Sequence, residues 1–548
     1  MRLTAIMLAL ACLPGNAVVA KETLTLRHTV LDLPGAPAKI LPADLNDDGR
    51  QDLVVVVAYI EVGQVSEDRI EDLISVTTII PAVFDRREVH VYLADTDGSY
   101  SSAAVLQLPS DALHMEAGPP GLPIVVLTDA GLSSLQLETA GDSSALSLVP
   151  VLVETPVLAN TGDFHADLQL VFELNGDEFP DLLFPTARGP VIFLGNGHGL
   201  DTDAADRVDL GLAERHTMRH TSLRYPTVDV RHVNGDRFPD LVLPSLEGSP
   251  ATQHVWLGSQ EGSFRPIRVD ASDCHDRLTD IRLDAVETDA SPWPVNLVAL
   301  EDLDGDGRAE AILSDLKDRG DGMRSEMKDA KRPLQTYRFH RLTDDLKIAA
   351  EPYFETEVMG HTASGDASFE VSRAGANLFE DLDGDGRKDL VTLTLDFSLL
   401  QVLKVMVAKR ISIGLDFHVY AQDESGQFKA VPGLDLSEKL KLNLNNLVIG
   451  RFAQFAGDFD GDGRQDFAHF GRGKTLTLHR GQPGCVYPTR PDLTILLEDE
   501  PASLDLVRVE DLDGDGRSDI RVTRPGVVTD PDASAPVRVD LYLSGDKP

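Results

Sequence analysis

The chain has 548 residues, of which 50 are Lys or Arg and 90 are Asp or Glu, so its formal net charge is −40. Hydrophobic residues make up 42% of the chain, which is enough for folded cores and argues against a disordered protein. The acidic excess argues against a nucleic-acid partner, because such binding depends on basic contacts to phosphates.

Residues 1–20 have the pattern of a secretory signal peptide, with a basic start, an apolar run and small residues before the end. We therefore predict a secreted protein, extracellular or periplasmic, that is cleaved after Ala20. The alternative is a lipoprotein anchored through Cys12. No later segment has the ~18 uncharged apolar residues that a membrane helix needs, so no membrane span is predicted. The sequence leaves open whether Cys274 and Cys485 pair.

A short acidic pattern occurs seven times along the chain, in its fullest form Asp-x-Asp-Gly-Asp-Gly-x-x-Asp. Positions 1, 3, 5 and 9 carry oxygen-bearing side chains, which are the ligands that Ca²⁺ prefers. The candidate ligands of the first three copies are Asp44, Asn46, Asp48, Asp52; Glu173, Asn175, Asp177, Asp181; and Asn234, Asp236, Asp240. Those of the four fullest copies are Asp302, Asp304, Asp306, Glu310; Asp381, Asp383, Asp385, Asp389; Asp458, Asp460, Asp462, Asp466; and Asp511, Asp513, Asp515, Asp519.

The spacing within each copy predicts a tight loop followed by a strand. Glycine at position 6 supplies a positive-φ turn that folds the loop around an ion. Glu178 and Arg237 take that place in the second and third copies, so we expect these two loops to turn differently. An EF-hand is excluded, because position 12 of the full copies is not Glu and strand-like segments such as 389–393 follow position 9.

The spacing of the copies predicts a ring of similar sheets. Their first positions lie 53 to 129 residues apart, and the longest step indicates a hidden unit without a metal loop at 122–137. Because a small four-stranded sheet cannot bury both faces alone, we predict an all-β propeller of seven or eight four-stranded blades, with eight slightly favoured. It occupies 21–548 as one domain, and the N-terminal strand 24–30 completes the last blade beside 537–543.

Two insertions interrupt this rhythm, at about 61–84 and about 396–413. Apolar residues at helical spacing predict a short amphipathic helix in each insertion. These helices either pack onto the propeller or form a docking surface for a partner or a second subunit.

The acidic loops between short strands resemble the FG-GAP/VCBS repeats of integrin α-chain head propellers and of many secreted bacterial proteins. The resemblance covers nearly the whole chain after residue 20 and implies a β-propeller with Ca²⁺ in loops that join neighbouring strands of a blade. About four to seven ions are expected. The third copy departs from the pattern, because His232 stands at its first ligand position.

These observations predict a calcium-binding repeat protein that acts as a non-catalytic binding or adhesion scaffold, with structural Ca²⁺ and an unknown protein or glycan ligand. The alternative is an enzyme, a hydrolase or a lyase, that uses the propeller as a frame. Its site would lie in the central channel or at the insertions.

Overall fold

The described part of the chain consists of strands and the turns between them. The computed structural model describes residues 24–59, 79–80, 86–119, 121–140, 143–165, 168–210, 214–216, 221–223, 228–244, 252–271, 296–315, 334–359, 379–396, 410–443, 448–449, 453–455, 457–470, 474–498, 507–524 and 537–545. Within these ranges there is no helix, and so none that is long and apolar enough to cross a membrane. The predicted signal peptide lies outside them.

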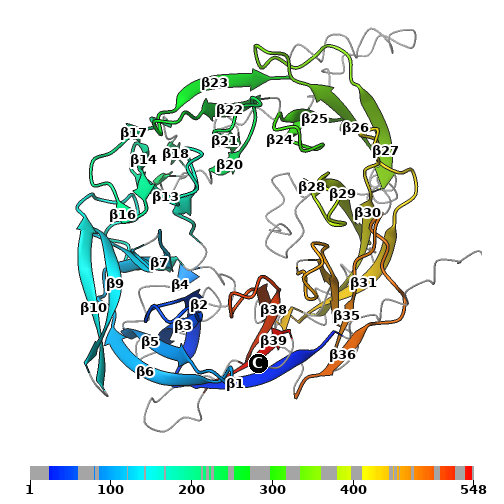
Figure 1. Cartoon of the computed structure of the whole chain (residues 1–548). Helices are drawn as coiled ribbons and strands as arrows, with labels where there is room; N and C mark the ends of the chain where they lie inside the picture. The colour runs from blue at the N-terminus through cyan, green and yellow to red at the C-terminus, as the bar shows by residue number, and fades with distance from the viewer. Residues whose placement is uncertain are drawn as a thin grey trace, which may run out of the picture.

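Eight antiparallel sheets form a ring, so the fold is an eight-bladed β-propeller, as predicted (Figure 1). Blades 1 to 4 consist of β2 (Ala36–Ala43), β3 (Asp52–Tyr59), β5 (Arg86–Ala94), β6 (Tyr100–Gln107); β7 (Ala112–Ala117), β8 (Ile124–Thr128), β9 (Gly131–Ala140), β10 (Ser143–Leu152); β12 (Val171–Phe172), β13 (Asp181–Thr186), β14 (Gly189–Phe193), β17 (Asp206–Arg207); and β20 (Asp229–Arg231), β21 (Asp240–Pro244), β22 (Thr252–Leu257), β23 (Arg265–Asp270). Blade 2 is the unit that we predicted without a metal loop.

Blades 5 to 8 follow the same order, and the last one takes its fourth strand from the N-terminus. They consist of β24 (Asn296–Glu301), β25 (Glu310–Asp315), β26 (Leu334–Arg341), β27 (Phe354–Met359); β28 (Phe379–Glu380), β29 (Asp389–Asp396), β30 (Arg410–Tyr420), β31 (Leu434–Asn443); β33 (Ala453–Phe455), β34 (Phe467–Phe470), β35 (Thr475–His479), β36 (Leu493–Leu496); and β37 (Val507–Glu510), β38 (Asp519–Arg524), β39 (Val537–Ser544), β1 (Leu26–Leu33). The first strands, such as β20 and β24, lie near the axis, and the fourth strands, such as β23 and β27, lie at the rim (Figure 1).

Short strands supplement the eight blades. They are β4 (Ile79–Ile80) with β11 (Phe164–His165), β15 (Gly195–Asn196) with β16 (Gly199–Leu200), β18 (Glu214–His216) with β19 (Thr221–Leu223), and β32 (Val448–Ile449) at the edge of blade 6. Most of both predicted insertions lies outside the described residues. Where their ends are described, they are strands: 79–80 pairs with β11, and 410–413 belongs to β30.

The core lies between neighbouring blades, and this placement explains the sequence of the second strands. All eight residues of β3 are buried, because both faces of this strand are covered by other blades. An uninterrupted run of branched apolar residues is what such a doubly covered strand requires. By contrast, only one of the eight residues of the rim strand β6 is buried. Between blades 1 and 2, Val54 and Val56 pack in one apolar cluster with Met115 and Ile124.

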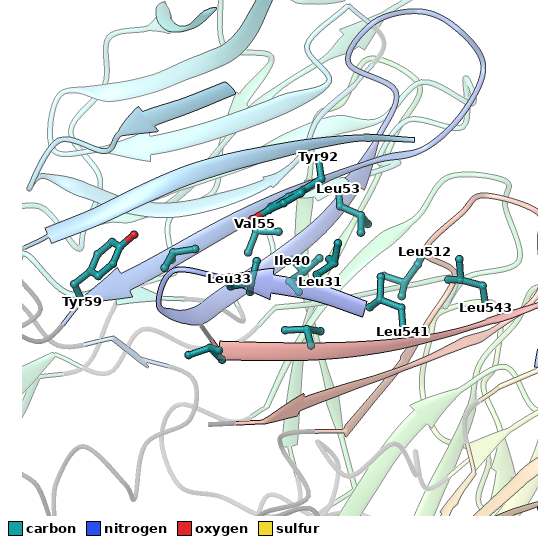
Figure 2. Packing of buried hydrophobic residues seen from close by; sticks show 13 residues of the cluster. Leu31, Leu33, Ile40, Leu53, Val55, Tyr59, Tyr92, Leu512, Leu541 and Leu543 are labelled. Atoms are coloured by element: carbon teal, nitrogen blue, oxygen red, sulfur yellow. The ribbon is translucent and has the colours of Figure 1, made fainter. Parts of the chain in front are cut away.

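The ring closes where the two ends of the chain meet. β1 pairs antiparallel with β39 over eight residues, from Leu26 opposite Ser544 to Leu33 opposite Val537. On one face of β1, Leu31 and Leu33 join the buried cluster that links blade 8 to blade 1 (Figure 2). Full burial of a leucine side chain contributes about 1.5–3 kcal/mol. The N-terminal strand therefore stabilises both the last blade and the seam beside it.

Candidate metal centres

The acidic loops occupy equivalent places in their blades. Each runs from the first to the second strand of its blade, so topology places all seven on the same face of the ring. The four fullest loops belong to the consecutive blades 5, 6, 7 and 8, and the other three belong to blades 1, 3 and 4. The candidate ligands of the four fullest loops therefore gather on one half of the propeller.

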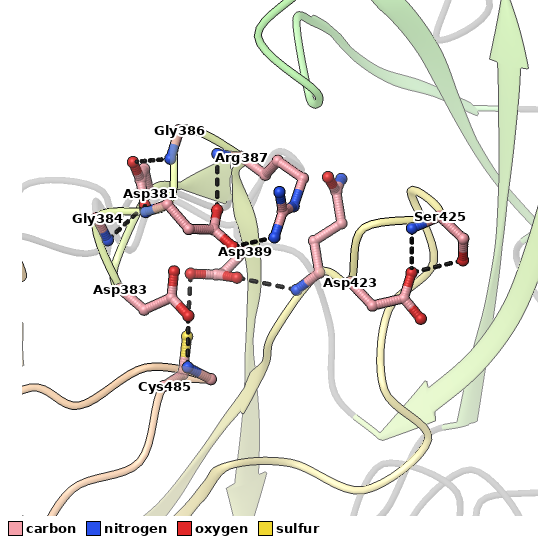
Figure 3. Close-up of polar contacts among 12 residues, drawn as sticks. Asp381, Asp383, Gly384, Gly386, Arg387, Asp389, Asp423, Ser425 and Cys485 are labelled. Atoms are coloured by element: carbon pink, nitrogen blue, oxygen red, sulfur yellow. Dashed lines mark hydrogen bonds and ion pairs between the residues drawn. The ribbon is translucent and has the colours of Figure 1, made fainter. Parts of the chain in front are cut away.

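The carboxylate at position 1 caps its own loop. In blade 6, Asp381 Oδ1 accepts the backbone N–H of Gly384 at 2.8 Å, and its Oδ2 accepts that of Gly386 at 2.9 Å (Figure 3). Both glycines have positive φ angles, 72° and 85°. This conformation costs other residues about 1–2 kcal/mol. The prediction of a positive-φ glycine at position 6 is thus confirmed here, and position 4 of this loop is a positive-φ glycine as well. The same capping occurs at Asp302, Asp458 and Asp511.

The second loop corrects one expectation. Glu178 stands at its position 6 with φ of 71°, so this loop keeps the left-handed turn without a glycine there. A non-glycine residue holds this conformation when its surroundings enforce it. Here the Glu173 carboxylate accepts three successive backbone N–H groups, those of Asn175, Gly176 and Asp177.

The carboxylate at position 9 fastens the loop to the body of the blade. Asp389 is 1% exposed and accepts two backbone N–H groups, from Leu382 at 3.1 Å and from Gln422 at 2.9 Å. The first donor stands at position 2 of the same loop, and the second follows the third strand of the same blade. Asp52, Asp181, Asp240, Asp466 and Asp519 make the same pair of bonds. Position 9 therefore has a structural role that the sequence pattern did not reveal.

Burial of these anchoring carboxylates changes their acidity. Burial raises the pKa of Asp389 to about 6 and those of Asp466 and Asp519 to about 7, although two backbone N–H groups oppose the shift at each residue. Removal from water disfavours the charged form of a carboxylate. A cation held in the loop would favour that charged form again.

The carboxylate at position 3 distinguishes the four fullest loops. In each of them one oxygen, Oδ1, is buried and has no hydrogen-bond partner; the residues are Asp304, Asp383, Asp460 and Asp513. Nearly all buried polar atoms in proteins are satisfied, and an ion is one of the few explanations for an exception. The same four residues belong to clusters in which carboxylate oxygens of three residues lie within 4.8 Å of one another. The clusters are Asp302, Asp304, Asp306; Asp381, Asp383, Asp385; Asp458, Asp460, Asp466; and Asp511, Asp513, Asp519.

In the three loops with Asn at position 3, the asparagine side chain donates a hydrogen bond to the aspartate at position 5. In the first loop, Asn46 Nδ2 donates to Asp48 Oδ2 at 3.0 Å, and Asn46 Oδ1 accepts the backbone N–H of Asp48. The equivalent side-chain bond measures 2.9 Å between Asn175 and Asp177 and 2.7 Å between Asn234 and Asp236. An amide can donate to the carboxylate at position 5, whereas a carboxylate at position 3 can only repel it. Among the described residues, none of these three loops forms an acidic cluster. Their predicted role as ligands stays a prediction.

Arginines neutralise part of the acid. Arg341 at the end of β26 contacts Asp304 Oδ2 at 2.7 Å and also binds Glu310, while Arg480 contacts Asp460 Oδ2 at 2.9 Å. Within three loops the arginine at position 7 pairs with the carboxylate at position 5; the pairs are Arg50–Asp48, Arg387–Asp385 and Arg464–Asp462. The four position-3 Oδ1 atoms keep no partner despite these contacts.

Neighbouring loops are joined to one another around the ring. The backbone N–H at position 8 of one loop donates to a carbonyl at position 1 or 2 of the loop before it; the bonds are Ala309 to Val233, Lys388 to Leu303, Gln465 to Leu382 and Ser518 to Asp458, at 2.7–3.1 Å. A Cβ atom on Gly384 would lie only 2.5 Å from the carbonyl oxygen of Gly463 in the next loop. In blade 6, glycine at position 4 is thus required by a close approach as well as by its φ angle, whereas the first loop has Asp47 at that position with φ of 57°.

Comparison with known proteins identifies no family for this chain. No family model and no curated protein matches the sequence. Among solved structures, the pore of the Photorhabdus luminescens Tc holotoxin is similar over 94% of this chain and 19% of that one, with 14% identity and a TM-score of 0.30. The outer coat vertex of COPII on membranes is similar over 92% of this chain and 84% of that one, with 8% identity and a TM-score of 0.25. The chain thus spans about a fifth of the toxin chain.

The fold and the loops together define the class of protein. It is an eight-bladed β-propeller scaffold in which the described residues form four Asp triads that could hold metal ions.

Proposed function

We propose that the chain is an exported, calcium-stabilised β-propeller of the FG-GAP/VCBS type that serves as a non-catalytic binding or adhesion scaffold. The observation that carries the calcium proposal is the unpartnered, buried Oδ1 at position 3 of four loops. Each lies in a cluster of carboxylates. Such clusters of oxygen donors suit a hard cation of the size of Ca²⁺.

Calcium in these loops would act on stability. Each loop joins the first two strands of a blade, and its position-9 carboxylate reaches the end of the third strand. The backbone bonds between loops extend this connection to the next blade. A bound ion would therefore hold strands of one blade together and relieve repulsion between carboxylates that the protein alone leaves unpaired.

Metal content and thermal unfolding test the calcium proposal. We expect purified protein to contain three to four tightly bound Ca²⁺, at most one for each Asp triad, when measured by elemental analysis after extensive dialysis. Removal of the metal with a chelator should lower the melting temperature, and added Ca²⁺ should restore it. An unchanged melt in excess chelator, with protein shown to be metal-free, would refute a structural role for calcium.

The architecture supports the proposed binding role. A propeller presents loops on its two faces and leaves its strands to build the core, so loop residues are available for a partner. Capture of surface proteins and glycans on the immobilised full chain, with Ca²⁺ and with chelator, tests this role. A partner retained only with Ca²⁺ supports the scaffold. Turnover of a glycan or peptide by the pure protein would instead support the enzyme alternative.

Export is tested separately at the N-terminus. Mass spectrometry of the mature protein should find a chain that begins at Lys21. A lipid-modified chain that begins at Cys12 would show the lipoprotein alternative.

A further inference from the structure

One of the four Asp triads has a sulfur atom beside it. Cys485 lies between β35 and β36 of blade 7, in a segment that reaches the acidic loop of blade 6. Its thiol is 1% exposed and donates a hydrogen bond to Asp389 Oδ2, with 2.9 Å between sulfur and oxygen (Figure 3). The neighbouring Gly484 N–H donates to Asp383 Oδ2. Two adjacent residues of blade 7 thus contact positions 3 and 9 of a single loop.

A second observation points to a ligand at the same place. Asp383 is 7% exposed, and its Oδ1 is buried without a hydrogen-bond partner. The loop therefore has an unsatisfied carboxylate oxygen on Asp383, whose other oxygen contacts Gly484, next to the residue whose buried thiol contacts Asp389. In blades 5 and 7 the corresponding position-3 carboxylates contact an arginine instead, Arg341 or Arg480. Among the described residues, a cysteine lies beside this acidic loop alone.

We propose that the acidic loop of blade 6 is a mixed oxygen–sulfur site that takes a thiophilic divalent cation, such as Zn²⁺, in preference to Ca²⁺. Asp383, Asp389 and Cys485 are its assigned ligands. The inference deepens the proposed function, because it rests on cation binding in these loops. Thiolate selects soft or borderline cations, while Ca²⁺ takes oxygen ligands almost alone. When the cation binds, the S–H bond breaks, a metal–sulfur bond forms and the proton passes to water.

The backbone that carries the thiol is held in a fixed turn. Cys485 has φ of 56°, a left-handed conformation that a non-glycine residue keeps only when its surroundings enforce it. Paired backbone bonds between Gln482 and Val486 close the turn around it. A Cβ atom on Gly433 would lie 2.6 Å from the Cys485 carbonyl oxygen, so blade 6 packs closely against this turn.

The site also has an entry path. A cavity of about 440 Å³ opens beside the loop and is lined by Asp383, Asp385, Lys429 and Gly484, among others. Its volume admits a hydrated cation as far as Asp383. Four acidic residues line it, which outnumber the three basic ones, Arg387, Lys429 and Arg464. A metal site needs such access in addition to its ligands.

Cadmium is the probe that tests the sulfur ligand directly, because a Cd²⁺–thiolate bond adds a charge-transfer absorption in the ultraviolet. The full-length mature protein is stripped of metal and titrated with Cd²⁺ and, by calorimetry, with Zn²⁺. We expect the new absorption to saturate at one Cd²⁺ per chain. It should persist in Cys274→Ser, which removes the only other cysteine of the mature chain, and should vanish in Cys485→Ser.

Calcium binding separates this proposal from the proposed function. Cys485→Ser should weaken Zn²⁺ binding at least about tenfold, as loss of a metal-binding partner does, while the other loops still bind Ca²⁺. Asp383→Asn should weaken Zn²⁺ binding in the same way, and Asp513→Asn, in the loop of blade 8, should leave the Cd²⁺–thiolate absorption unchanged. No charge-transfer absorption in the wild-type protein, or an equal one in Cys485→Ser, overturns the mixed site. A protein that binds neither Ca²⁺ nor Cd²⁺ overturns the proposed function as well.

Discussion

Replacing one carboxylate by an amide should remove the stabilisation that calcium gives to one loop. Asp513→Asn in blade 8 introduces the side chain that stands at position 3 of the loops of blades 1, 3 and 4. The amide can then donate to Asp515, as Asn46 donates to Asp48 at 3.0 Å. We expect the variant to be at least as stable as the wild type without metal, and less stable with calcium.

The magnitude follows from the geometry of the cluster. Carboxylate oxygens of Asp511, Asp513 and Asp519 lie within 4.8 Å of one another. At an effective dielectric constant of about 20, two charges at that distance repel each other by about 3.5 kcal/mol, and solvent at the exposed Asp511 reduces this value. With Ca²⁺ at 100 times its dissociation constant, one site stabilises the folded state by about 2.7 kcal/mol. The variant should lose that contribution and one bound ion.

Denaturant unfolding of both proteins, in chelator and in saturating Ca²⁺, measures the two effects. The matched control is Asn46→Asp, which gives the first loop a carboxylate at each of its four ligand positions. It should destabilise the metal-free protein and gain about the same 2.7 kcal/mol with Ca²⁺. A variant Asp513→Asn that binds as many ions as the wild type and keeps its full response to calcium would refute the reasoning.

Three further predictions concern packing, backbone and pH. Leu31→Ala should cost about 2–5 kcal/mol of unfolding free energy, because Leu31 is 3% exposed in the seam, whereas Val30→Ala, at a 38% exposed neighbour, should cost less than about 0.5 kcal/mol in the same denaturant melts. Gly384→Ala should lower the melting temperature more than Gly386→Ala: both need positive φ, but a Cβ at Gly384 meets the next loop and one at Gly386 meets nothing within 4 Å. His114 is fully buried, and burial lowers its pKa, so its contribution to stability is present above the unfolded pKa of about 6.5 and is lost as pH falls below it, at up to about 1.4 kcal/mol per pH unit. His114→Asn should therefore flatten the decline of stability between pH 7 and pH 5, and an unflattened profile would contradict the assignment.

The position-9 carboxylate shows why the loops could be found in the sequence while the hydrogen bonds that fasten them to the blades could not. The spacing of the acids identifies the loops, because a tight turn must bring alternate side chains to one point. The second backbone donor to Asp389 comes from Gln422, 33 residues away. No local pattern indicates such a partner, since it is set by strand pairing. The close approach of Gly384 to Gly463 is a contact between blades and was equally invisible.

The seven loops divide into those with Asp and those with Asn at position 3, and both the sequence and the structure are needed to explain this division. The exchange of Asp for Asn at position 3 can be read in the sequence, but its consequence appears only when the Asn46 amide is seen to bond Asp48. Cys485 gave no signal at all, because 96 residues separate it from Asp389. The helical spacing in the two insertions remains a prediction, because most of both segments lies outside the described residues.

Local chemistry was therefore decided by the sequence alone. Acids at fixed spacing, glycines that permit positive φ and short apolar runs predict acidic loops between strands and a ring of about eight blades. These features depend on residues close together in the chain. The partners of each loop were decided by the tertiary structure. Which oxygen is satisfied, which loop meets an arginine or a thiol, and which loops touch all depend on how blades pack around the ring, and packing brings together residues that no spacing relates.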